Sequence, residues 1–168
     1  VSTETLSLVE KLSINRYDKV LDVGAGLGAQ SKAIIERLGL NHAQYIGTDI
    51  SSTCVDKARS FGFDFFCDDL RVTNTDFKDS FDLIIAIKIL YYCAPEIDQT
   101  LSNIRDYLRS GGVLAYIYNE TPDSFSMRWL SLKVLREKLE KHFTLQYSEE
   151  KKSGIEITAV DIWKINDC

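Results

Sequence analysis

The stretch VLDVGAGLG, residues 20–28, decides the fold. Its first half is an apolar run typical of a buried strand, and Gly24, Gly26 and Gly28 follow directly. Because glycine has no side chain, the backbone can turn sharply here and approach a ligand closely. Apolar residues then recur at helical spacing over residues 30–38. The stretch predicts a strand, a glycine turn and a helix; the plainer interpretation is a turn that only packs this helix against the strand.

The rest of the chain repeats this alternation. Strands are predicted at residues 43–50, 63–69, 81–90 and 112–120, and helices at residues 6–12, 52–60, 97–108 and 126–142. Such alternation favours a parallel sheet covered on both faces. Residues 142–165 instead give strand, polar turn and strand, which are too close together to run parallel. We therefore predict an α/β fold: a doubly wound, mostly parallel seven-stranded sheet with a C-terminal antiparallel hairpin and helices on both faces.

Three local signals refine this plan. The run FDLIIAIKIL, residues 81–90, is continuously apolar, which favours a central strand covered on both faces. Thr53 and Asp56 have the spacing of a capping box for the helix at residues 52–60. Pro95 is expected at the start of the next helix, where a missing backbone N–H costs little.

Size and charge limit the partners. The 168 residues suit a single domain, taken as residues 1–168, and 20 Lys and Arg against 25 Asp and Glu give a net charge of -5. The cations are not clustered, so no nucleic-acid partner is expected. No apolar run approaches the roughly 18 residues of a membrane span, so neither a membrane contact nor secretion is expected. Because the chain begins at Val1, we expect it to be trimmed or part of a longer protein.

Cysteine use favours a reducing compartment. Cys54, Cys67, Cys93 and Cys168 are scattered and form no CxxC pair. This pattern is typical of a reduced, cytoplasmic protein and argues against a zinc site or a disulfide framework. We expect no bound metal.

Four aspartates accompany the glycine loop. Asp49 closes the second predicted strand and Asp68 and Asp69 close the third, so all three are expected at the carboxyl edge of the sheet, where ligands bind. Asp49 suits the two hydroxyls of a ribose, and its alternative is a cap for the following helix. For Asp68 and Asp69 the alternative is a solvated turn. Asp22 lies inside an apolar strand; because a buried carboxylate needs partners, we expect it to meet amides of the glycine loop or the ligand.

The residues around the loop favour a cationic ligand. A phosphate would require cations or a GK[ST] ending, which GLGAQS at residues 26–31 lacks. A nicotinamide dinucleotide stays open, because the pattern GxGxxG read from Gly24 permits Ala29 at its last position. The predicted site carries up to four carboxylates and, apart from Lys88, no evident base. Such a site suits a cation better than a pyrophosphate.

Together these motifs resemble those of the class I (Rossmann-like) S-adenosylmethionine-dependent methyltransferases, over essentially the whole chain. VLDVGAGLG is similar to the first motif of this family, GTDIS (residues 47–51) to its second-strand acidic motif, and FFCDDL (residues 65–70) to its adenine-site motif. LRSGGVLAYIY (residues 108–118) is similar to the segment through the fifth strand, and the hairpin to the family's sheet ending. The resemblance implies a methyltransferase with S-adenosyl-L-methionine as its cofactor.

The resemblance also implies roles at the adenosine end of this cofactor. Asp49, with Ile50 beside it, would bind the ribose hydroxyls. Asp68 would accept a hydrogen bond from the adenine amino group, with the backbone of Asp69 and the side chain of Leu70 beside the ring.

At the methionine end, the resemblance implies that the three glycines bring the backbone against the methionine and ribose portions. Asp22 would help to fix the ammonium group. Ile87 and Lys88, at the end of the fourth predicted strand, would line the methionine side.

No catalytic residue is assigned. Methyl transfer mainly requires an acceptor in line with the sulfur–methyl bond, and a general base is needed only if the acceptor must lose a proton. The candidates after the fourth and fifth strands are Tyr91, Tyr92, Lys88 and Glu120. The alternatives are packing for the two tyrosines and a solvated or paired lysine. Both histidines are expected away from the site.

The expected acceptor is an oxygen or nitrogen atom of a small molecule or saccharide. KILYYCAP, residues 88–95, stands where amino methyltransferases of DNA and glutamine carry Asn/Asp-Pro-Pro-Tyr/Phe, and its ILYY resembles small-metabolite and sugar methyltransferases. With no inserted lid, the open site suits either a substrate larger than itself, such as a saccharide chain end or a protein side chain, or a lid supplied by a partner chain or missing domain. The alternatives are a non-catalytic module that binds the cofactor and supports a partner, and an NAD(P)-dependent oxidoreductase, which a parallel final strand would favour.

Overall fold

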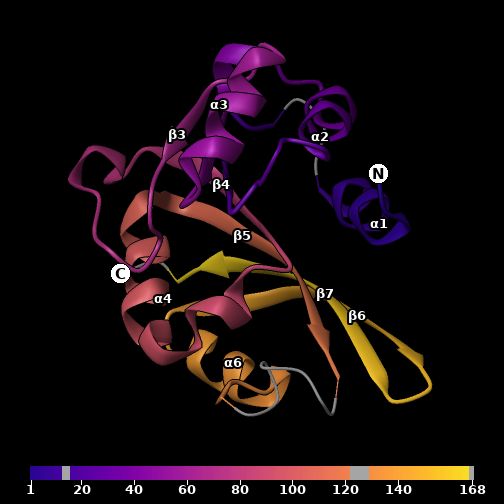
Figure 1. Cartoon of the computed structure of the whole chain (residues 1–168). Coiled ribbons are helices and arrows are strands. Elements are labelled where there is room, and N and C mark those ends of the chain that lie inside the picture. The colour runs from indigo at the N-terminus through magenta and orange to yellow at the C-terminus, as the bar shows by residue number, and fades with distance from the viewer. Residues whose placement is uncertain (13–15, 122–128, 167–168) are drawn as a thin grey trace.

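A computed structural model describes residues 1–12, 16–121 and 129–166, and its elements follow the predicted order (Figure 1). The strands are β1 (Val20–Val23), β2 (Tyr45–Asp49), β3 (Phe65–Cys67), β4 (Phe81–Ile87), β5 (Leu108–Glu120), β6 (Phe143–Ser153) and β7 (Glu156–Ile165). The α-helices are α1 (Thr3–Lys11), α2 (Ser31–Leu38), α3 (Ser52–Ser60), α4 (Ile97–Tyr107) and α6 (Leu132–Leu139). Short 3-10 helices occupy His42–Gln44, Thr75–Phe77 and Leu90–Glu96.

The strands form one seven-stranded sheet in the order β3-β2-β1-β4-β5-β7-β6. Strands β1 to β5 pair with one another in parallel. By contrast, β7 runs antiparallel to both β5 and β6. The predicted fold class and closing hairpin are confirmed, and the antiparallel β7 counts against the oxidoreductase alternative.

The strand order reverses beside β1. From β1 the chain proceeds to β2 and β3 on one side, and it then crosses to β4 on the other side. In doubly wound sheets, ligands bind beyond the carboxyl ends of the strands at such a reversal. The glycine loop follows β1 directly, so the topology brings it to this position.

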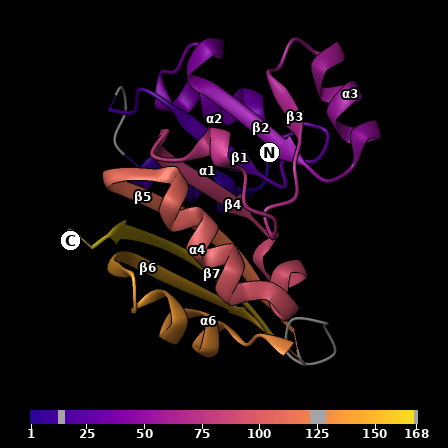
Figure 2. The same cartoon turned by 90° about the vertical axis from the view of Figure 1, so that its left-hand side faces the viewer.

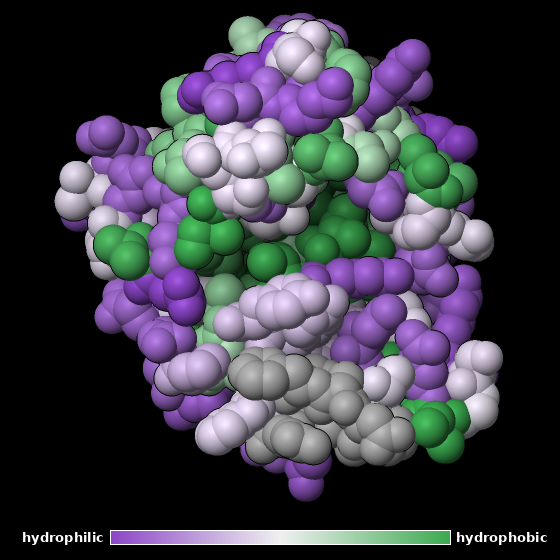
Figure 3. Space-filling view, viewed as in Figure 1, coloured by the Kyte–Doolittle hydropathy of each residue, from purple (hydrophilic) through white to green (hydrophobic). Residues whose placement is uncertain are grey.

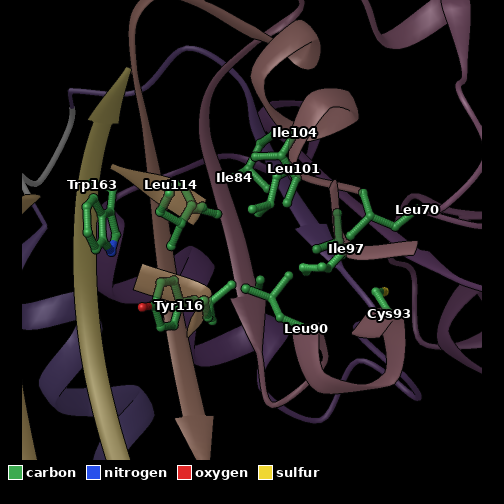
Figure 4. Packing of buried hydrophobic residues seen from close by; sticks show 14 of the residues in the cluster. Leu70, Ile84, Leu90, Cys93, Ile97, Leu101, Ile104, Leu114, Tyr116 and Trp163 are labelled. Atoms are coloured by element: carbon green, nitrogen blue, oxygen red, sulfur yellow. The ribbon is translucent and has the colours of Figure 1, made fainter. Parts of the chain in front are cut away.

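Helices cover both faces of the sheet, and a hydrophobic core fills each side. In Figure 2, α4 lies across the near face with α6 below it. Leu101 and Ile104 of α4 pack with Ile84 of β4 in one core, as Figure 4 shows. The other core joins α1, α2 and α3 to alternate residues of the same strand, Leu83 and Ile85. All three β4 residues are 0% exposed, so β4 is the central, doubly covered strand that its apolar run predicts.

The structure corrects several predicted element ends. The N-cap of α3 is Ser51, whose Oγ accepts a hydrogen bond from the Cys54 N–H; the capping box at Thr53 and Asp56 is wrong because both residues lie inside the helix. Pro95 lies inside the preceding 3-10 helix, and α4 begins two residues later. The helix predicted at residues 126–142 is α6, and residues 126–128 lie outside the described residues.

A buried ion pair joins α6 to β7. Asp161 is 0% exposed, and Nε and Nη2 of Arg136 donate hydrogen bonds to its carboxylate at 2.8 and 2.9 Å. The Tyr116 hydroxyl of β5 donates to the same carboxylate at 2.5 Å. Nη2 of Arg136 also donates to Ser148 at 3.0 Å, and its Nη1 donates to Glu150. These contacts fix α6 against the hairpin.

Within the described ranges, no helix is long and apolar enough to cross a membrane. The His, Cys, Asp and Glu side chains of the same residues form no group of three or more that could hold a metal ion. Cys54, Cys67 and Cys93 are free thiols, and Cys168 lies outside the described residues.

Candidate active site

A cavity of about 290 Å³ lies where the strand order reverses, at the carboxyl ends of β1 and its neighbours. On the face drawn in Figure 3, hydrophobic side chains gather in a hollow near the middle, among more polar surroundings. The cavity is close to the lower end of the ~300–1,000 Å³ typical of small-molecule sites. Of the predicted cofactor-binding residues, Gly24, Asp49, Ile50, Asp68, Asp69 and Leu70 line it. The other lining residues are Thr48, Arg71, Ile89, Tyr92 and Cys93.

The glycine loop turns as its sequence predicts. Gly24, Gly26 and Gly28 have φ angles of 65°, 58° and 74°, a region that disfavours residues with a Cβ. A Cβ at Gly24 would lie 2.5 Å from Cγ1 of Ile89, and one at Gly28 would lie 3.1 Å from the Phe63 ring. These two positions therefore also fit the packing interpretation. A Cβ at Gly26 would meet no described atom within 4 Å, so this glycine is open to a ligand.

Replacing Gly24 by alanine is expected to lower the free energy of unfolding by more than about 2 kcal/mol. The left-handed backbone costs roughly 1–2 kcal/mol for a residue with a Cβ, and the Ile89 side chain must also move. Urea denaturation measures the loss. Gly154→Ala in the β6–β7 turn is the matched control, because Gly154 has φ 60° and no described atom within 4 Å of a Cβ. Equal losses for the two variants would contradict the contact with Ile89.

Asp49 links β2 to the glycine loop. Its Oδ2 accepts a hydrogen bond from the Gly26 N–H at 2.9 Å, and its Oδ1 accepts one from the Ser51 N–H at 2.9 Å. Because Ser51 caps α3, the alternative of Asp49 as the helix cap is wrong. Each carboxylate oxygen can accept more than one hydrogen bond, and the side chain is only half-buried. Asp49 can therefore still accept ligand hydroxyls.

Asp68 and Asp69 lie in different electrostatic surroundings. Burial raises the pKa of Asp68, while a hydrogen bond from Nδ2 of Asn74 at 2.8 Å acts in the opposite direction. The hydrogen bonds from Arg71 hold the pKa of Asp69 below its usual value. These bonds run from Nε and Nη2 of Arg71 at 2.9 and 2.8 Å. Both aspartates line the cavity, which the solvated-turn alternative did not predict.

The prediction that Lys88 is the only evident base of the site is wrong, because Arg71 lines the cavity. Its guanidinium offsets the Asp69 charge and lies 3.9 Å from a carboxylate oxygen of Glu96. The sequence does contain a signal for this pair. Arg71 stands two residues after Asp69 in a turn, which is close enough for a bidentate contact.

Asp22 does not meet the glycine-loop amides, so that part of the expectation is wrong. Its side chain, 2% exposed on β1, accepts a hydrogen bond from the Tyr45 hydroxyl of β2. Burial raises the pKa of Asp22 to about 7, and the hydrogen bond from Tyr45 opposes this increase. The loop amide that does reach a carboxylate belongs to Gly26, and its acceptor is Asp49.

Five of the predicted cofactor-binding residues are not among the described residues that line the cavity: Asp22, Gly26, Gly28, Ile87 and Lys88. Ile87 packs against the core under α1, α2 and α3. Lys88 leaves β4 with a left-handed φ of 56°, and its N–H donates to the Ile117 carbonyl at 2.8 Å.

The catalytic candidates have different surroundings. Tyr92 lines the cavity and is 62% exposed. The Tyr91 ring lies 4.6 Å from that of Tyr92 and 5.7 Å from that of Tyr118, which favours the packing alternative. Burial raises the pKa of Tyr91 to about 12, so its phenol stays protonated at neutral pH. Glu120 accepts a hydrogen bond from the Leu132 N–H at the start of α6 and lines a different cavity.

A family model described as a methyltransferase domain matches residues 21–114, which include the glycine loop, Asp49, Asp68 and all of β4. The chain belongs to the class I S-adenosylmethionine-dependent methyltransferases. The cofactor of this methyltransferase is therefore S-adenosylmethionine, as the resemblance of its motifs to the family implies.

Relatives of this methyltransferase include much longer proteins. It is 33% identical over 105 residues to the highly reducing polyketide synthase verA of Penicillium polonicum, a match that covers 57% of this chain and 4% of that protein. The methyltransferase spans 3–5% of the length of such curated relatives.

Solved structures share the fold. The N-methyltransferase NodS of Bradyrhizobium japonicum WM9, in complex with S-adenosylhomocysteine, has a TM-score of 0.78 at 17% identity, over 98% of this chain and 85% of that one. The CurJ carbon methyltransferase has a TM-score of 0.75 at 21% identity, over 98% of this chain and 54% of that one.

Proposed function

We propose that this methyltransferase binds S-adenosylmethionine in the cavity beside Gly24 and transfers the methyl group to an oxygen or nitrogen atom of a small molecule or saccharide. The observation that carries the proposal is that one cavity combines the carboxylates of Asp49 and Asp68 with apolar surface from Ile50 and Leu70. The adenosine end of the cofactor offers hydroxyl and amino donors around a flat ring. Carboxylate acceptors on either side of an apolar surface fit these groups.

At the adenosine end, Asp49 accepts the ribose hydroxyls in this proposal, and its half-buried carboxylate already lies at the loop. Asp68 accepts from the adenine amino group, with the Asp69 backbone and Leu70 beside the ring. Ile50 is 62% exposed and lines the cavity, so it can cover the other side of the ring. Because Asp69 is paired with Arg71, the carboxylates of Asp49 and Asp68 are the ones that accept hydrogen bonds from the ligand in this proposal.

At the methionine end, the open backbone at Gly26 lets the cofactor approach, and Gly24 and Gly28 shape the loop. Asp22 acts from below the loop on the ammonium group. In this proposal Ile87 and Lys88 lie beside the methionine portion, although neither lines the described cavity.

The bound cofactor supplies a methyl group made electrophilic by its sulfonium. The chain's residues orient the acceptor, which can contribute roughly 7–11 kcal/mol when the geometry is realised. Tyr91 stays protonated and Glu120 is engaged at the start of α6, so we favour an acceptor that needs no proton removed, such as a neutral amine. Tyr92, exposed at the cavity, is the residue best placed to contact it.

A second acceptor class is a carbon atom of a polyketide intermediate. The observation that favours it is the 33% identity to a polyketide synthase, together with the shared fold of a carbon methyltransferase. A non-catalytic module that supports a partner chain is the other alternative. The single-domain division, the lid supplied by a partner or missing domain, and the cytoplasmic location stay predictions.

Isothermal titration is expected to show that one S-adenosylhomocysteine binds per chain and that NADH does not bind. Labelled S-adenosylmethionine is then offered with amino sugars, phenols and β-ketoacyl thioesters, and the products are identified by mass spectrometry. Label on nitrogen or oxygen supports the proposal, whereas label only on the thioester carbon favours the polyketide alternative. Cofactor binding without any labelled product favours the non-catalytic module, and binding of NADH alone would contradict the cofactor assignment.

A further inference from the structure

A buried polar unit lies beneath the glycine loop. The Tyr45 hydroxyl donates a hydrogen bond to the Asp22 carboxylate and lies 2.9 Å from Oγ of Ser31. Because the phenol has one proton, which it gives to Asp22, the serine hydroxyl must donate to the tyrosine oxygen. Asp22, Tyr45 and Ser31 are 2%, 1% and 0% exposed.

The unit joins the three elements around the loop. Asp22 belongs to β1, which leads into the loop, and Ser31 is the first residue of α2, which leads out of it. Tyr45 begins β2, the strand whose last residue is Asp49. Tyr45 belongs to the same buried core as Ile34 and Ile85, and Ile85 is the β4 register partner of Asp22. A carboxylate in such surroundings is costly unless it is hydrogen-bonded or paired with a cation.

We propose that Tyr45 is a positioning residue of the cofactor site. Its hydroxyl holds the buried Asp22 carboxyl group in place as an anion, and this anion binds the ammonium group of the methyl donor. This inference rests on the proposed function. Tyr45 stands at the end of β2 opposite to Asp49, whereas Asp22 stands two residues before Gly24, so Tyr45 acts through Asp22 rather than by contact with the ligand. Ser31 fixes the phenol from the other side and thereby orients the proton that Asp22 receives.

The charge of Asp22 makes this role dependent on pH. Burial is the larger influence and raises its pKa to about 7, while the Tyr45 hydrogen bond lowers it. Ser31 from α2 and Ile85 from β4 bring no charge to the group. Ammonium binding favours the ionised carboxylate, so affinity should rise as the pH increases through about 7. Without the phenol, the pKa of Asp22 rises further and the same increase in affinity requires a higher pH.

The test compares two ligands on the same protein. S-adenosylhomocysteine carries the ammonium group, whereas 5′-methylthioadenosine keeps the adenosine and thioether but lacks it. At neutral pH, Tyr45→Phe is expected to weaken binding of S-adenosylhomocysteine about 10-fold and to change that of methylthioadenosine less than about twofold. Titrations from about pH 6 to about pH 8.5 should show that the affinity curve of the variant is displaced to higher pH.

Tyr116→Phe is the matched control, because it also removes a buried phenol that donates to a buried aspartate, Asp161, on the opposite face of the sheet. It should leave both affinities unchanged. Asp22→Asn keeps the shape of the side chain and should make the affinity for S-adenosylhomocysteine independent of pH. This second variant tests the role of the Asp22 charge even if Tyr45→Phe does not fold.

Equal weakening of both ligands by Tyr45→Phe would overturn the proposal, because it would show a structural role only. An unchanged affinity for S-adenosylhomocysteine would overturn it as well, as would a pH dependence that persists in Asp22→Asn. If the unmodified protein binds neither ligand, the proposed function itself fails. If both ligands bind but Tyr45→Phe and Tyr116→Phe have the same affinities, only the positioning role of Tyr45 fails.

Discussion

Replacing Asp49 by alanine is expected to weaken the binding of S-adenosylhomocysteine by about 100-fold or more. A hydrogen bond to a charged group contributes roughly 1.5–3 kcal/mol, and the carboxylate is proposed to accept two ribose hydroxyls. The substitution also removes the acceptor of the Gly26 N–H, which lies 2.9 Å from Oδ2, so the loop loses one of its links to β2 and keeps the hydrogen bond from the Ala25 N–H to the Thr48 carbonyl. Isothermal titration measures the dissociation constant.

Two variants separate these contributions. Asp56→Ala removes an exposed carboxylate on α3 and changes the net charge equally, so it should leave the affinity within about twofold. Asp49→Asn keeps an acceptor but loses the charge, and we expect an intermediate loss of about 10-fold. An Asp49→Ala protein with a native circular dichroism spectrum and full affinity would contradict the ribose role. It would reduce Asp49 to a link between the loop and β2.

Arg136→Met is expected to lower the free energy of unfolding by about 3–5 kcal/mol. The variant leaves the carboxylate of Asp161, which is 0% exposed, with the Tyr116 hydroxyl but without its cation. A buried charge that loses its partner costs far more than an exposed one, because water cannot replace the lost contact. Urea denaturation followed by circular dichroism gives the unfolding free energy.

Lys138→Met on the same helix is the control for this measurement. It removes an ion pair of similar length, 2.7 Å from Nζ to Oδ1 of Asp98, but Asp98 is 74% exposed. We expect a loss of about 0–1 kcal/mol there. Adding Asp161→Asn to Arg136→Met should recover part of the larger loss, because the unpaired charge is then gone. Similar losses for Arg136→Met and Lys138→Met would show that the buried pair adds no more than the exposed one.

The fold follows from the sequence because buried parallel strands are apolar runs bounded by turns, and this chain alternates them regularly with helices. The ends of the strands were harder to predict. The apolar run of β4 continues past Ile87, but the left-handed φ of Lys88 ends the strand. Hydrophobicity does not report such a backbone conformation. Similarly, β3 covers only Phe65–Cys67, although the predicted strand ran to Asp69.

The place of the acidic residues was predictable, and their partners were not. Carboxyl ends of parallel strands meet at one edge, so Asp49 and Asp68 could be brought together from the sequence alone. The partner of Asp22 depends on which side chain of the neighbouring strand and helix faces it, and that is set by register and packing. Tyr45 stands at the other end of β2 from Asp49, where no motif marks it.

The position of β7 has a consequence for how the chain folds. β6 precedes β7 in the chain, but among the described strands it pairs with β7 alone, which lies between it and β5. During synthesis, β6 therefore has no sheet neighbour until residues 156–165 emerge. The edge of β5 stays unpaired until then, because its partner β7 begins about 40 residues after β5 ends. Unpaired edges of this kind template aggregation. A chain interrupted within the hairpin should consequently aggregate rather than persist as a smaller folded sheet.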